Sequence, residues 1–160
     1  MTIGARVRID GGEALQRALV EAIGRVDDLT PLMRTFAQAM AFASEEAFRL
    51  QRDPATGVAW RPLTARTAAA LVTKGGARRG PRPILQVTGR LAGSITTSAG
   101  KSWARIGTNV VYAAIHQFGG RAGRQLAAQI PARPYIGLGP ADLADMERSA
   151  AQFIEGVRGQ

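Results

Sequence analysis

The sequence contains no cysteine and only one histidine, His116, among its 160 residues. The lack of cysteine excludes disulfides and thiolate-bound metal sites. A metal site built on His116 would need carboxylate ligands, yet no Asp or Glu lies between Asp53 and Asp142. The same gap leaves His116 without a neighbouring carboxylate that could orient it as a general base. We therefore expect no metal, no cofactor and no catalytic site, and we interpret His116 as a structural residue.

Other functional classes are also disfavoured by what is missing. No stretch approaches the ~20 consecutive apolar residues that a membrane-spanning helix requires. The segment Ala99-Gly-Lys-Ser102 ends like a phosphate-binding loop, but Ile95 stands where the pattern needs glycine. Glu45 and Glu46 are adjacent on an expected helix, point in different directions and cannot form a catalytic pair. The sequence thus predicts a protein that is not an enzyme.

Acidic residues are absent from more than half of the chain. Residues 1–53 carry seven Lys and Arg against eight Asp and Glu, a balance of −1, and residues 142–160 carry two against four, a balance of −2. Residues 54–141 carry twelve basic side chains and no acidic one, which is a balance of +12. Such a one-sided block repels itself unless it faces negative charge. We therefore expect an anionic partner, although a merely solvated basic face is the alternative.

Hydrophobic periodicity predicts a single domain over residues 1–160. Helices are expected over about 13–26, over 31–52 with Thr30 as the N-cap, and from Pro140 to the C-terminus, each with an apolar stripe. A short helix capped by Thr64 is expected over 64–71. Strands are expected near 94–98 and 103–106 from alternating residues, and 110–118 stays ambiguous between helix and strand. The fold class is α+β, with a small central antiparallel sheet against long N- and C-terminal helices.

Two glycine-rich basic segments are predicted to be flexible loops, at residues 74–82 and 119–127. Neither contains enough apolar side chains to offset the entropy of ordering. Together with Arg133, which is held between prolines, these loops supply the predicted interaction residues. They are Lys74, Arg78, Arg79, Arg82, Arg121, Arg124 and Arg133.

Several short motifs follow one another in a fixed order through the same region. They are Asp53-Pro-Ala-Thr-Gly-Val-Ala-Trp60, Ile84-Leu-Gln-Val-Thr-Gly-Arg-Leu91, Tyr112-Ala-Ala-Ile-His-Gln-Phe-Gly-Gly120 and Ile130-Pro-Ala-Arg-Pro-Tyr-Ile-Gly-Leu138. In this order they resemble the phage virion morphogenesis family, the tail completion proteins of Mu-like phages and prophages. The resemblance spans roughly residues 30–157, and the segment from Tyr112 to Gly120 is its most specific part.

The resemblance implies a structural role at the head–tail junction of a virion. It implies assembly in the host cytoplasm, phage tail and head–neck proteins as partners, and self-association, expected as a hexameric ring. Contact with genomic DNA stays open, because the basic loops could face DNA or acidic subunits. The alternative function is a stand-alone DNA-binding protein without sequence specificity. The residues that match the family pattern, interpreted as fold and subunit-contact residues, are Trp60, Gly89, Leu91, Tyr112, His116, Gln117, Phe118, Gly119, Arg133 and Pro134.

Overall fold

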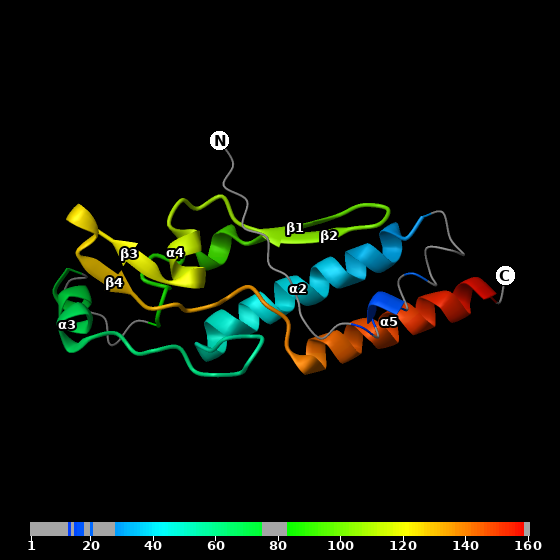
Figure 1. Cartoon of the computed structure of the whole chain (residues 1–160), viewed down its shortest axis with the longest axis horizontal. Helices are drawn as coiled ribbons and strands as arrows, with labels where there is room; N and C mark the ends of the chain where they lie inside the picture. The colour runs from blue at the N-terminus through cyan, green and yellow to red at the C-terminus, as the bar shows by residue number, and fades with distance from the viewer. Residues whose placement is uncertain (1–12, 14, 18–19, 21–27, 75–82, 159–160) are drawn as a thin grey trace.

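The long helix α2, Thr30–Leu50, is the element on which the rest of the fold packs in this computed structural model (Figure 1). The structure describes residues 13, 15–17, 20, 28–74 and 83–158. The Asp28 carboxylate accepts a hydrogen bond of 2.8 Å from the Thr30 amide, and Leu29 holds the N-cap position without a side-chain cap. The prediction that Thr30 is the N-cap is therefore wrong, because the upstream carboxylate serves the first free amide instead. The helix ends at Gln51, whose φ of 51° is left-handed.

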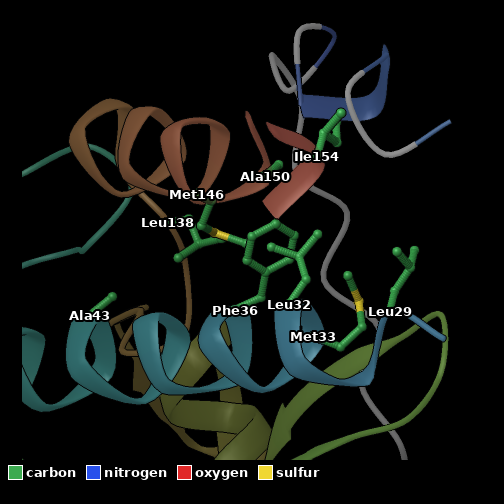
Figure 2. Close-up of a cluster of buried hydrophobic side chains, with 9 residues drawn as sticks. All are labelled: Leu29, Leu32, Met33, Phe36, Ala43, Leu138, Met146, Ala150 and Ile154. Carbon is green, nitrogen blue, oxygen red and sulfur yellow. The ribbon is translucent and has the colours of Figure 1, made fainter. Parts of the chain in front are cut away.

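The C-terminal helix α5, Pro140–Arg158, lies alongside α2 and buries an apolar face against it (Figure 1). Its first turn is stabilised by Asp142, whose carboxylate accepts a 2.8 Å bond from the Gly139 amide, as in a capping box. Side chains from the two helices and their flanking residues meet in one cluster, which Figure 2 shows in close-up. The cluster comprises Leu29, Leu32, Met33, Phe36, Ala43, Leu138, Met146, Ala150 and Ile154.

A β-hairpin covers the other side of α2 (Figure 1). Its strands are β1, Thr96–Ala99, and β2, Ala104–Gly107, paired antiparallel with Thr97 opposite Ile106. The hairpin turn contains Gly100, where an added Cβ would lie 2.5 Å from the Trp103 indole. The loop-like segment Ala99–Ser102 is therefore a hairpin turn followed by a strand, without the helix that a phosphate-binding loop requires.

The remaining elements gather around the C-terminal end of α2, away from most of α5 (Figure 1). A second two-stranded antiparallel sheet lies there, and the ambiguous segment 110–118 contains a short helix, α4. These elements are α3, Ala65–Lys74; 3₁₀ turns at Ala92–Ser94 and Arg124–Leu126; α4, Ala113–Phe118; β3, Gly120–Ala122; and β4, Ala128–Ile130. The predicted α+β class is confirmed, with the strands divided between two separate hairpins.

A second apolar cluster holds this end of the molecule to α2. It is built from Ala47, Phe48, Trp60, Leu91, Val110, Ala113 and Tyr135. Thr64 caps α3 as predicted, because its hydroxyl accepts a bond from the Thr67 amide. Residues 119–127, predicted as a flexible loop, include β3 and the 3₁₀ turn at Arg124–Leu126. The predicted basic loop at 74–82 lies outside the described residues except for its first position, as does most of the helix predicted over 13–26.

Candidate functional site

The motif segments, far apart in the sequence, meet around the extended stretch 131–138. Gln117 of α4 joins two of them through its buried amide. Its Oε1 accepts bonds from the amides of Tyr135 and Ile136 at 3.0 and 3.1 Å, and its Nε2 donates to the Ile136 carbonyl at 2.8 Å. One side chain thus satisfies three main-chain groups in a stretch that pairs with no strand among the described residues, which explains why the motif holds glutamine here.

The first motif folds into a turn that packs Trp60 against Phe48 of α2. Both carboxylate oxygens of Asp53 accept 2.9 Å bonds inside this turn, from the Ala55 amide and the Thr56 hydroxyl. The chain then reverses, and the Trp60 amide donates to the Gln51 carbonyl at 2.8 Å. Trp60 is buried, as predicted for an anchor of this loop.

Three aromatic rings and their polar atoms lock the motif segments together. The Phe48 ring meets Trp60 edge-to-face at 5.7 Å between centroids and lies 5.1 Å from Tyr135. The Trp60 Nε1 donates to the Pro134 carbonyl at 2.7 Å, and the Tyr135 hydroxyl donates to the Ala113 carbonyl at 3.0 Å. Burial raises the pKa of Tyr135 to about 12, so the hydroxyl stays protonated as the donor this contact needs.

Arg133, which was predicted to be an interaction residue, is buried instead of lying on the surface. Its side chain is only 5% exposed, and its Nε and Nη2 donate to the Arg61 carbonyl at 3.0 and 2.9 Å. Nη2 also reaches the Pro62 carbonyl at 3.4 Å. The grouping of Arg133 with the exposed basic residues is corrected on this ground: the guanidinium caps main-chain carbonyls of the turn that follows Trp60. These hydrogen bonds explain why an arginine stands at this position of the motif.

His116 is half-buried at the same junction. Its carbonyl accepts a 2.7 Å bond from the Arg133 amide, and its ring meets Tyr112 edge-to-face at 5.8 Å. Burial, followed by the nearby Arg133 guanidinium, lowers the pKa of His116 below its usual value. Within the described residues its buried Nδ1 has no hydrogen-bond partner. The environment thus favours a neutral imidazole, which packs against the Tyr112 ring.

Two motif glycines occupy left-handed turns with different surroundings. Gly119 has a φ of 72°, and an added Cβ would lie 2.7 Å from the Ala132 nitrogen. Gly89 has a φ of 70° with open space around it, and it begins the turn that leads to the buried Leu91. Gly119 is therefore required by both conformation and close backbone approach, whereas Gly89 is required by conformation alone.

Three of the basic residues that the structure describes lie on the surface of the end built from α3, α4 and the β3–β4 hairpin. Arg66 on α3, Arg121 on β3 and Arg124 in the following turn are all exposed. This end, which we call the acid-free end, contains no Asp or Glu, because every acidic residue lies at position 53 or before, or at 142 or after. The side chain of Lys74, and Arg78, Arg79 and Arg82 entirely, lie outside the described parts of the chain.

Large apolar side chains are exposed at several places, among them α2 and the segment around α4. Val111, two residues before α4, is 94% exposed, and Phe118, the last residue of α4, is 56% exposed. On α2, Phe42 is 62% exposed. The sequence did carry a signal for Phe42, because helical spacing places it with Gln38 and Glu45 on the polar face of the helix.

The described residues contain neither a candidate metal site nor a helix suited to crossing a membrane. No group of three or more His, Asp or Glu side chains comes together among them. No helix within these residues is both long and apolar enough to span a bilayer. What the site does offer chemically is a rigid junction of motif residues under a surface of arginines and exposed apolar side chains.

Comparison with known proteins places this architecture among phage assembly proteins. The model of the phage virion morphogenesis family matches residues 10–155, and the chain belongs to that family. The chain is similar to "Mu-like prophage FluMu G protein 2" of Haemophilus influenzae, with 35% identity over 93% of this chain and 95% of that protein. It is similar to "Putative capsid assembly protein G" of Escherichia phage Mu, with 38% identity over 86% of each. No solved structure matches it significantly.

Proposed function

We propose that this protein completes the phage tail and joins it to the head, acting as one subunit of a ring at the neck of the virion. Membership of the virion morphogenesis family supports a structural role in particle assembly. The name of the phage Mu relative refers to capsid assembly, and a protein at the junction would contact both head and tail. The partners in this proposal are tail and head–neck proteins, and the protein acts without catalysis.

The observation that carries the proposal is the surface of the acid-free end, which exposes both arginines and aromatic motif residues. No acidic residue belongs to α3, α4, β3 or β4, and this end exposes Arg66, Arg121 and Arg124 together with the motif residues Tyr112 and Phe118. Buried motif residues such as Gln117 build the fold, whereas the exposed ones contribute nothing to either apolar cluster. A surface of this kind suits contacts to other assembly subunits, because interfaces are enriched in aromatic residues and arginine.

The proposal is tested by reversing charge at the acid-free end in the phage or prophage that encodes the protein. Arg66→Glu combined with Arg124→Glu should leave a folded protein, since both side chains are exposed. We expect separate heads and tails to accumulate in lysates, counted by electron microscopy, with a large drop in infectious particles. The matched control is Arg34→Glu on the exposed face of α2, which should leave the titre nearly unchanged.

Two outcomes would contradict the proposal. Normal joined particles from a strain lacking the gene would exclude a role at the junction. Tight binding of the purified protein to short DNA duplexes at physiological salt, with normal joining by the double variant, would favour the stand-alone DNA-binding function.

A further inference from the structure

Phe42 is unusual because an exposed aromatic ring stands on the polar face of α2. One turn further along the helix are Glu45, which is exposed, and Glu46, whose carboxylate binds Arg49 at 2.5 Å. Glu45 has no ion-pair partner among the described residues. The combination of Phe42 and Glu45, which we call the α2 patch, is an apolar anchor beside an unpaired negative charge.

A second patch of opposite character lies on α4 and the strand that follows it. Ala114 and Phe118 lie one turn apart on α4 and are exposed, and Val111, two residues before the helix begins, is exposed as well. Arg121 is exposed three residues after Phe118, in a region with no acidic residue to neutralise it. We call these four residues the α4 patch: exposed apolar side chains in one short segment that also carries a positive charge with no ion-pair partner among the described residues.

The two patches point away from one shared core. Ala47 and Phe48 on the buried face of α2 belong to the same apolar cluster as Ala113 on the buried face of α4. Phe42 lies on the opposite side of α2 from Ala47 and Phe48, and Phe118 turns away from Ala113 by the same helical geometry. Phe42 and Phe118 therefore turn away from the core that their helices share, and neither patch carries charge of both signs.

We propose that the α4 patch of one subunit docks on the α2 patch of a second copy of this chain, so that subunits associate head to tail. The inference rests on the proposed ring at the neck and names the surfaces that form it. Phe118 and Val111 would pack against Phe42, while Arg121 would pair with Glu45 of the neighbour. Two different surfaces that join in this way make a heterologous contact, which closes into a ring when the rotation between subunits permits.

The absence of cysteine from the chain allows a direct test by cross-linking. A Phe42→Cys, Phe118→Cys double variant, oxidised in cells assembling particles, should give a ladder of disulfide-linked multimers on non-reducing gels. Neither single variant should give a disulfide-linked dimer, because each contact needs one cysteine from each patch. The matched control is Val58→Cys with Phe118→Cys, since Val58 is 66% exposed but belongs to neither patch and should not cross-link.

Charge exchange supplies an independent readout in the same cells. Glu45→Arg and Arg121→Glu should each lower the number of joined particles at least about tenfold, the effect of losing one desolvated pair. The double exchange should restore most of the loss, whereas Glu155→Arg, an exposed acid on α5, should have no effect.

Three results would overturn the proposal. They are a disulfide-linked dimer from Phe42→Cys alone, which would mean a symmetric contact; the absence of a ladder from the cysteine pair; and no recovery in the double charge exchange. These failures are distinguishable from failure of the proposed function, because they leave the joining defect of a strain lacking the gene intact.

Discussion

Replacing Gln117 with methionine tests how the motif segments are held together. Met has a similar unbranched shape, so the Gln117→Met variant removes hydrogen bonds without leaving a large cavity. The change leaves the amides of Tyr135 and Ile136 and the Ile136 carbonyl without the partners that lie at 3.0, 3.1 and 2.8 Å. Within the part of the chain that the structure describes, no strand pairs with this stretch and could replace those bonds.

The magnitude follows from the number of bonds lost. Each hydrogen bond contributes about 1 kcal/mol net, and an unsatisfied buried group costs about 1–3 kcal/mol. Three bonds, partly compensated by water reaching the half-buried Ile136, give a loss of about 3 kcal/mol in the free energy of unfolding. With a urea dependence of about 2 kcal/mol/M, the midpoint should fall by about 1.5 M.

The assay is urea unfolding followed by circular dichroism, at a protein concentration low enough to suppress self-association. The matched control is Gln38→Met on the exposed face of α2, which should change stability by less than about 0.5 kcal/mol. If Gln117→Met unfolds within about 0.5 kcal/mol of the native protein, the main chain at 135–136 has other partners and the clamp assignment is refuted.

Three further outcomes follow from the same junction. Gly119→Ala should destabilise by about 2–4 kcal/mol, because a Cβ would meet main-chain atoms, whereas Gly89→Ala, with open space, should cost only about 1 kcal/mol in thermal unfolding. Trp60→Phe should lower stability by about 1–3 kcal/mol through the lost indole hydrogen bond and smaller ring, and should remove the blue-shifted component of tryptophan fluorescence. Since burial lowers the pKa of His116, the unfolded state binds its proton first, so stability should be full above about pH 6.5 and fall as pH drops through that value. His116→Gln should remove this dependence in unfolding measured from pH 5 to 8, and an unchanged pH profile would contradict it.

Patterns that depend on local periodicity were predictable from the sequence. The apolar stripes of residues 31–52 and of the C-terminal helix gave α2 and α5 nearly to their observed bounds. The alternation around Trp103 gave the β1–β2 hairpin within two residues, because an alternating run is typical of a half-buried strand. Helix starts were less predictable, because the Asp28 carboxylate competes with Thr30 for the first free amide.

The junction itself depends on contacts between residues distant in sequence, which periodicity does not encode. Gln117 and Tyr135, or Trp60 and Pro134, become partners only when the turns between them are fixed. Family resemblance identified these residues, but not whether each is buried. Arg133 illustrates the limit: charge suggested an exposed contact, whereas nearby carbonyls make burial of its guanidinium acceptable.

The most direct test of the proposed function is electron microscopy of assembled virions in which this protein carries a small density label at an exposed position outside both patches, such as Glu155. The proposed role predicts a ring of labels at the end of the tail that meets the head, and label-free heads and tails that remain separate when the gene is deleted. Label density spread over the capsid shell, or joined virions without the protein, would contradict it.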